Sequence, residues 1–287
     1  MSQIELFRNP ERLRSPLRLL LIYGLAAAIS LVALFPFYWM FTTSIKDPAE
    51  VYFTPPTLVP ESFTLSHYEE VLTNAAFVRF FINSLLIASI TVIIVLVLAI
   101  PAAYSLGRAK YRGRLGFSRF IFVFYLFPGV LLLVPLYLLI SKLQLQDNPL
   151  GLVIVYTTFM APYATILIRE YLMQIPRELE DAAFVDGASQ WRVIWSIITP
   201  LARPGIAVAA IITFIGSWSE FIMASMLTVS QSNKTLPVGL YEWMGTYDIE
   251  WGRLTSGAVI TAIPILVLFI IMGRVLIRGL LGGAMKG

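Results

Sequence analysis

Long stretches without a charged residue alternate along the chain with short polar segments. Five such stretches cover 19–45, 80–107, 120–141, 148–168 and 254–273, and a sixth, 204–233, is interrupted only by Glu220. A helix needs roughly 20 apolar residues to cross the hydrocarbon of a bilayer. The pattern therefore predicts six membrane-spanning helices. They are expected near 19–41, 81–105, 118–140, 149–169, 205–228 and 256–278.

The basic residues predict how these helices are oriented. Sixteen of the 21 Lys and Arg fall in segments that would lie on one side of the membrane, and five fall on the other side. Because basic residues accumulate in cytoplasmic segments, both termini are predicted to be cytoplasmic. Residues 1–18 then form a cytoplasmic N-terminus, 44–80 an extracytoplasmic loop and 279–287 a cytoplasmic tail. The first apolar run is too long for a cleavable signal and should remain as an anchor.

Composition agrees with a multi-pass protein of the cell membrane and narrows its chemistry. The 287 residues are 58% hydrophobic and 13% charged, against about 25% charged in soluble domains. The net charge of +4 follows from membrane topology and needs no nucleic acid. The chain has no cysteine and one histidine, His67, which is expected to be an ordinary surface residue. A membrane enzyme would need more nucleophiles, bases or metal ligands than these.

The 44–80 loop carries a helix signal at its end. Four prolines precede it and stop any helix from running through the loop. Ser66 is followed three residues later by Glu69, the spacing of a capping box. A short amphipathic helix is therefore predicted to start there and lead to the second span.

A few polar residues within or beside the spans are candidates for a substrate pathway. An ionisable residue inside a membrane helix is costly, so Glu220 is a functional candidate by default. An interfacial glutamate beside a belt tryptophan, Trp218, explains the same pattern. Asn83 and Tyr163 are milder candidates, and Asn83 equally suits a helix-packing hydrogen bond. Prolines recur within the spans and predict kinks, at Pro101, Pro128, Pro135, Pro162 and Pro264.

The loop over residues 230–253 contains three acids, three glycines and four Tyr or Trp. Ordered loops of this length are often functional. Aromatic rings flanked by acids can meet a sugar or a protein surface, or they can lie at the headgroup level as a belt. The sequence leaves these alternatives open.

The polar segment 176–204, PRELEDAAFVDGASQWRVIWSIITPLARP, predicts two short helices joined at Gly187. Pro176 and the acids that follow it suit a first helical turn. Ser189 can cap a second helix, which Pro200 is expected to end. This coupling segment (residues 176–204) therefore has the character of a docking element on the cytoplasmic side.

The spacing in the coupling segment resembles the signature loop of ATP-binding-cassette (ABC) importer permeases. That signature is Glu-Ala-Ala, three residues, Gly, nine residues, then Ile-x-Leu-Pro. Here it is matched by Asp181-Ala182-Ala183, Gly187 and Ile197 to Pro200, with Asp in place of Glu and Thr199 in place of Leu. The resemblance implies an all-α, six-helix type I ABC importer permease fold, with a permease domain over 79–272.

Further motifs are similar to the second permease subunit of maltose-type and related oligosaccharide importers. They are DGA (186–188), WSEF (218–221), TLPVGL (235–240), WGRLTSGAVITAIPILVLF (251–269) and GLLGGAMKG (279–287). The implied function is translocation of a sugar, with a di- or oligosaccharide expected. A permease for a non-sugar solute such as a polyamine is the alternative.

The resemblance also implies partners and residue roles. The partners are a homologous second permease, two ATP-binding subunits and an extracytoplasmic sugar-binding protein. The coupling residues towards the ATPase are Glu180, Asp181, Ala182, Ala183, Asp186, Gly187, Ile197 and Pro200, and either Glu180 or Asp181 makes the main contact. The tail would touch the ATPase pair. The residues towards the binding protein are Leu236, Pro237, Gly239, Trp243 and Trp251.

Nucleotide chemistry is expected to belong to the partners. The chain contains no Gly-rich phosphate loop followed by Lys and Ser or Thr. It should therefore bind no cofactor and have no catalytic site or metal of its own, with ATP and Mg²⁺ held by the ATPase subunits. In maltose-type importers the main sugar site lies largely in the other permease, so Asn83, Tyr163, Trp218 and Glu220 are secondary candidates.

Overall fold

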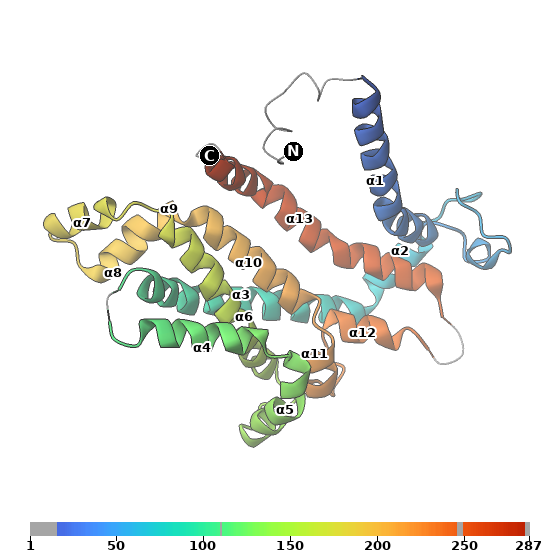
Figure 1. Cartoon of the computed structure of the whole chain (residues 1–287). Helices are drawn as coiled ribbons and strands as arrows, with labels where there is room; N and C mark the ends of the chain where they lie inside the picture. Colours follow the sequence, from blue (N-terminus) through green and yellow to red (C-terminus); the bar gives the residue numbers. More distant parts are fainter. Residues whose placement is uncertain (1–15, 110, 246–248, 285–287) are drawn as a thin grey trace. The chain divides into compact units, whose positions relative to one another are not determined.

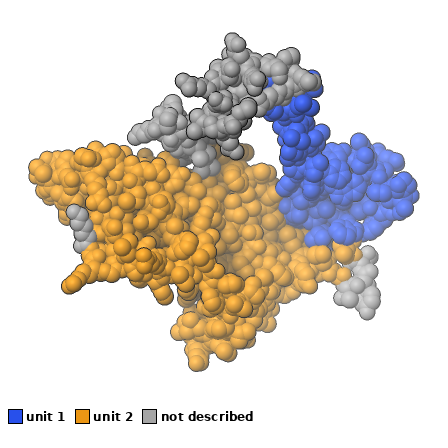
Figure 2. All heavy atoms as spheres, viewed as in Figure 1, with its two compact units in different colours: residues 1–71, 250–259 blue, residues 72–249, 260–287 orange. Residues whose placement is uncertain are grey.

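A computed structural model describes residues 16–109, 111–245 and 249–284, and this part of the chain is helical throughout, apart from loops and two isolated β-bridges (Figure 1). It divides into two compact units, residues 1–71 with 250–259 and residues 72–249 with 260–287 (Figure 2). Four helices are long and apolar enough to cross a membrane alone: Leu19–Ser44, Ala75–Gly107, Pro149–Met173 and Trp251–Gly273. The number rises to six if each of two sharply bent helix pairs counts as one span.

The first unit contains α1 (Pro16–Ser44), a 3-10 turn at Glu50–Tyr52 and α2 (Ser66–Thr73) up to Val71. Helix α2 starts at the predicted residue. The preceding loop is folded around the buried Glu50 carboxylate, which accepts hydrogen bonds from the Thr57 hydroxyl at 2.6 Å and the Glu61 amide at 3.0 Å. These bonds hold the pKa of Glu50 below its ordinary value, with the Thr57 hydroxyl contributing most.

The expectation for His67 was wrong. Its side chain is buried, and its Nε2 atom lies 3.1 Å from the Lys46 carbonyl oxygen. Gly252 leaves room for the ring, because a Cβ there would lie 2.2 Å from Nε2. The burial of His67 could not be predicted from the loop around it, because Gly252, which lies against the ring, is 185 positions further along the sequence.

The second unit is built on α3 (Ala75–Gly107), α6 (Pro149–Met173) and α10 (Arg203–Trp218), which pack against one another (Figure 1). Asn74 and Asn148 cap α3 and α6 by accepting backbone N–H bonds. Gly205 allows the close approach of α10 to α6, since a Cβ there would lie 2.3 Å from the Tyr171 ring. Two apolar cores result, one involving the coupling segment and one near α11 (Ile222–Leu227).

The prediction of one helix over 118–140 was wrong in detail. Helix α4 (Arg114–Leu126) ends in the middle of this range. A 3-10 turn (Gly129–Leu132) and α5 (Leu133–Lys142) then continue at 91° to α4. Phe127 is extended, with φ −70° and ψ 128°, because a residue before proline is excluded from helical geometry. Pro135 lies in the first turn of α5, whereas Pro101, Pro162 and Pro264 lie inside α3, α6 and α13 (Trp251–Ala284), which continue past them.

The helix predicted over 205–228 is also interrupted. Helix α10 ends at Trp218 and α11 begins at Ile222, so Glu220 lies in the break. Helix α13 includes the predicted last span and continues through residue 284. Residues 1–15 of the predicted N-terminus and 285–287 of the predicted tail lie outside the described residues. The topology and the domain boundaries stay predictions.

Candidate functional site

The first half of the coupling segment is α7 (Glu178–Val185), which ends in a Schellman turn at Gly187. The Ala188 amide donates to the Ala183 carbonyl at 2.9 Å, and the Gly187 amide donates to the Phe184 carbonyl at 3.0 Å. Gly187 has φ +81°, a left-handed conformation that other residues adopt only with strain. The glycine therefore sets the direction in which the chain leaves α7, as its spacing predicts.

Glu180 does not face outwards from α7. It is 5% exposed, and its carboxylate pairs with Arg108 at 3.1 Å and accepts a hydrogen bond from the Tyr104 hydroxyl at 3.0 Å. The same arginine, which is the C-cap of α3, donates to the Leu172 and Ile175 carbonyls at the end of α6. This anchor cluster (Tyr104, Arg108 and Glu180) ties α7 to the ends of α3 and α6.

The outward face of α7 carries different residues. Asp181, Ala182 and Asp186 are exposed, and Val185 is 88% exposed. Ala183 is buried against Ala188 and belongs to the core. Of the two adjacent acids between which the sequence left the choice open, Asp181 is the one that lies on an accessible surface.

The second half of the coupling segment joins α7 to α10. Ser189 accepts a hydrogen bond from the Arg192 amide at 3.4 Å and caps α8 (Gln190–Arg192), as predicted. A π-helical turn (Val193–Ile198) and α9 (Thr199–Leu201) follow, and the direction then changes by 82° into α10. Thr199 starts α9 and Pro200 is its second residue, so the helical run from Gln190 ends at Leu201, one residue beyond the end predicted from Pro200. Ile197 and Pro200 are half-buried.

The core beneath this segment is continuous with the spans. Val193, Ile194 and Ile198 are buried against Tyr104 of α3 and Leu172 of α6. Because packed cores have few voids, they transmit a displacement rather than absorb it. A force applied to α7 would therefore reach α3, α6 and α10 through both the anchor cluster and this core.

Glu220 caps α11. Its carboxylate accepts the Met223 amide at 2.8 Å, the Ala224 amide at 3.0 Å and the Tyr156 hydroxyl at 2.9 Å. These bonds use the carboxylate as the N-terminal cap of a helix. The acid thus has a structural role that explains its position between two apolar runs.

Two neighbouring cavities follow one face of α6. One, of about 260 Å³, is lined by Glu220 and Tyr156, and the other, of about 350 Å³, is lined by Tyr163 and Tyr125. Both share Phe159 of α6 as a lining residue. The structure thus places two of the four pathway candidates, Tyr163 and Glu220, in two neighbouring cavities.

The other two pathway candidates do not line these cavities. Trp218 is 1% exposed, its ring packs against Phe214 and Phe81, and its Nε1 donates to the Thr261 carbonyl at 3.2 Å. Asn83 donates to the Ser232 and Lys234 carbonyls at 2.8 and 3.0 Å. Both residues hold structure together, and Asn83 does so by bonding the loop before α12 rather than a neighbouring helix.

The loop after α11 is fixed to the α5–α6 connection. Asp147 accepts hydrogen bonds from the Ser230 and Val229 amides. The Ser230 side chain contributes most to holding the pKa of Asp147 below its ordinary value, and the two amides add to this effect. Helix α12 (Leu236–Glu242) then packs on α3. These contacts attach the loop to the α5–α6 connection and to α3.

The candidate binding-protein residues are mostly turned inward. Leu236 is fully buried, and Gly239 is so close to α3 that a Cβ would lie 2.0 Å from the Phe80 ring. Pro237 is half-buried, and Trp243 is half-buried and stacks on Phe77. Trp251, in the other unit, is 44% exposed. Packing therefore accounts for the TLPVGL motif, and Tyr241, at 60% exposed, is the accessible aromatic ring on α12.

These features describe a polytopic helical membrane protein in which a short exposed helix, α7, is tied to the long apolar helices. The family model for the inner membrane component of binding-protein-dependent transport systems matches residues 96–281, and the chain belongs to this family. The membrane location and the all-α permease fold predicted from the sequence are thereby confirmed.

Individual relatives cover nearly the whole chain. It is 35% identical to the inner membrane ABC transporter permease protein YcjP of Escherichia coli, over 92% of this chain and 95% of that protein. It is 32% identical to the trehalose/maltose transport system permease protein MalG of Thermococcus litoralis, over 94% and 97%. A chain of a bacterial ABC transporter involved in alginate import has the same fold, with a TM-score of 0.78, 24% identity and coverage of 90% and 97%.

Proposed function

We propose that this chain is one permease subunit of an ABC importer that moves a di- or oligosaccharide into the cell. The observation that carries the proposal is α7, an exposed helix fixed by the buried anchor cluster to α3 and α6. Such a helix can enter a groove on an ATPase subunit and pass its motion to the membrane helices. The chain itself hydrolyses nothing, and its partners hold ATP and Mg²⁺.

A sugar cargo is supported by the names of the relatives. Besides the trehalose/maltose permease, they include permeases for sulfoquinovosyl glycerol and for diacetylchitobiose. The fold is shared with a methionine transporter at a TM-score of 0.56 and 16% identity, so fold alone does not favour sugar. A polyamine or another non-sugar solute is the alternative cargo.

The complex comprises this chain, a homologous permease, two ATP-binding subunits and an extracytoplasmic binding protein. Asp181 meets a basic group of the ATPase, with Ala182, Val185 and Asp186 around it on the exposed face of α7. Tyr163 and Glu220 line the half of the pathway that this chain contributes.

Uptake in proteoliposomes tests the assignment. The complex, supplied with its binding protein and internal ATP, is expected to accumulate a labelled sugar from a panel of trehalose, maltose and chitobiose. Asp181→Lys should abolish uptake and reduce co-purification of the ATPase subunits, whereas Glu178→Lys on the same helix should have a smaller effect. Uptake of spermidine but of no sugar would refute the proposal that the cargo is a sugar.

Glu220 has its own test, because its capping role and a pathway role predict different results. Glu220→Gln keeps an oxygen that can accept the α11 amides but removes the charge. We expect changed uptake from an intact complex, and unchanged uptake would restrict Glu220 to capping α11.

A further inference from the structure

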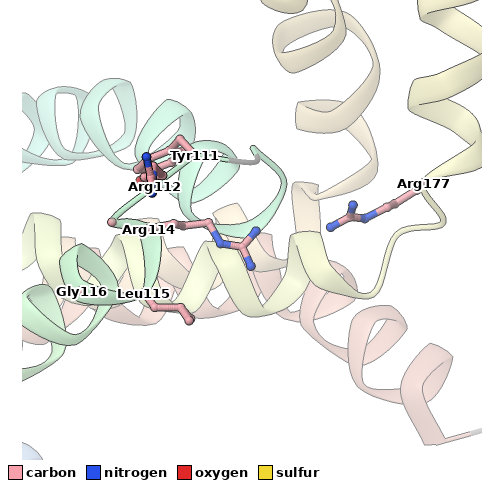
Figure 3. Close-up of a pocket in the computed structure, with 7 residues that line it drawn as sticks. Tyr111, Arg112, Arg114, Leu115, Gly116 and Arg177 are labelled. Atoms are coloured by element: carbon pink, nitrogen blue, oxygen red, sulfur yellow. The ribbon is translucent and has the colours of Figure 1, made fainter.

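An arginine-lined pocket lies where the start of α4 meets the residue before α7, and the proposed function assigns no ligand to it. The pocket is open, with a volume of about 640 Å³, and is lined by Arg112, Arg114 and Arg177 (Figure 3). Arg114 and Arg177 extend from opposite sides towards the same space, one from the first turn of α4 and one from the residue before α7. Three positive charges from two separate parts of the chain thus surround one hollow.

Within the described residues, none of the three arginines is in an ion pair. Arg114 donates one bond, from Nη1 to the Ala109 carbonyl at 3.1 Å. A guanidinium carries five N–H donors in a planar fork that suits phosphate oxygens, so most of the donors are left for a ligand.

The pocket also lies at the positive end of α4. That helix begins after Gly113, which has φ +91°, with no side chain capping it and no acid in its first turn. The first amides of a helix lack intrahelical partners, and the helix dipole favours an anion there. An arginine in the first turn opposes that dipole, and a bound anion would satisfy the arginine, the free amides and the dipole together.

The side chains next to the pocket indicate where the anion comes from. Leu115, Phe117 and Phe120 on α4 are 65, 53 and 64% exposed. Helix α4 is part of a bent pair with the length and composition of a membrane span. An anion at this position therefore has apolar side chains beside it, as the phosphate of a lipid has its acyl chains.

We propose that the arginine pocket (Arg112, Arg114 and Arg177) binds the phosphate headgroup of an anionic phospholipid in the leaflet that the charge distribution assigns to the cytoplasm. Basic residues accumulate on this side in any membrane protein. That tendency does not explain why Arg112, Arg114 and Arg177 line one pocket at the uncapped start of α4. Since Arg177 directly precedes α7, the lipid would lie against the start of the docking helix.

The test measures lipid retained by the whole complex. The complex is purified in detergent, stripped of lipid, and titrated with dioleoyl phosphatidylglycerol or dioleoyl phosphatidylcholine, and bound lipid is counted by native mass spectrometry. The triple variant R112Q/R114Q/R177Q is compared with R119Q/R192Q/R203Q, which removes the same charge from exposed arginines of the same predicted side. Arg114→Gln and Arg119→Gln form a milder matched pair in case the triple variant assembles poorly.

We expect selective binding of phosphatidylglycerol, weakened about fivefold for each pocket arginine removed and about unchanged in the control variants. Equal loss in both sets would overturn the proposal, because bulk charge would then explain binding. Displacement of the lipid by millimolar inorganic phosphate would overturn the claim that the bound phosphate group belongs to a lipid. Loss of the ATPase subunits with undiminished lipid binding would assign the pocket to a protein contact instead.

Discussion

The anchor cluster gives the sharpest prediction. Glu180→Gln keeps the shape of the side chain but leaves the Arg108 charge without its partner, and the two side chains are only 7% and 4% exposed. Breaking a buried ion pair from one side costs about 3–5 kcal/mol, because the remaining charge is uncompensated. Arg108 keeps its bonds to the Leu172 and Ile175 carbonyls. We therefore expect Glu180→Gln to lower the free energy of unfolding by about 3 kcal/mol, the lower end of that range.

Two further variants separate the parts of this cluster. Tyr104→Phe removes one hydrogen bond to a charged group, which should cost about 1.5–3 kcal/mol. Asp181→Asn changes an exposed residue next to Glu180 in the sequence and should stay within about 0.5 kcal/mol. The order of destabilisation is thus Glu180, then Tyr104, then Asp181.

The assay combines stability with coupling. Denaturant unfolding of the detergent-solubilised permease gives the free energies, and proteoliposomes give sugar transported per ATP hydrolysed. Glu180→Gln should lower both the free energy of unfolding and the transport ratio, since α7 is no longer held to α3. Asp181→Asn should leave the unfolding free energy unchanged and weaken ATPase binding. A Glu180→Gln protein as stable and as well coupled as the parent would refute the reasoning.

Three other predictions concern single positions. Gly187→Ala should lower the free energy of unfolding by about 1 kcal/mol, because the residue has a φ of +81°. Backbone strain alone is responsible, since a Cβ there meets no atom within 4 Å. Thermal melting followed by circular dichroism measures this loss. Gly239→Ala should cost about 1–3 kcal/mol through collision with Phe80, whereas Gly273→Ala, with no atom within 4 Å, should cost nothing by the same melt. Since the folded pKa of Glu50 is depressed, its contribution to loop stability is present above pH 4.5 and is lost as pH falls below it. Amide exchange at Glu61, corrected for intrinsic rate, should therefore rise on acidification, and Glu50→Gln should remove that dependence.

The sequence predicted the features that local pattern determines. Gaps between charges located the four long apolar helices with ends within about six residues of those observed, because a bilayer demands an uncharged length that little else demands. The position of Gly187 and the Ser189 cap followed from spacing, since each acts on residues within a turn of itself. The membrane class and the family were predicted for the same reason.

Features that depend on distant contacts were not predicted. Arg108 was counted only as a topology charge, and nothing near it in the sequence indicates a bond to Glu180, 72 residues further on. Trp218 was read as lining a path because a tryptophan beside an acid is ambiguous until its neighbours are known. Pro128 was predicted to kink one continuous helix. In the structure α4 ends at Leu126, and the chain continues after Pro128 at 91° to it.

Burial of the ion pair beneath α7 gives the inward and outward faces of this helix different responses to salt. Mobile ions screen charges at the surface, with a Debye length of about 10 Å at 0.1 M, but have little effect on a pair enclosed by protein. A contact through the exposed Asp181 should weaken as ionic strength rises, while the attachment of Glu180 to Arg108 stays intact. High salt would then release an ATPase subunit from a docking helix that keeps its place on the membrane domain.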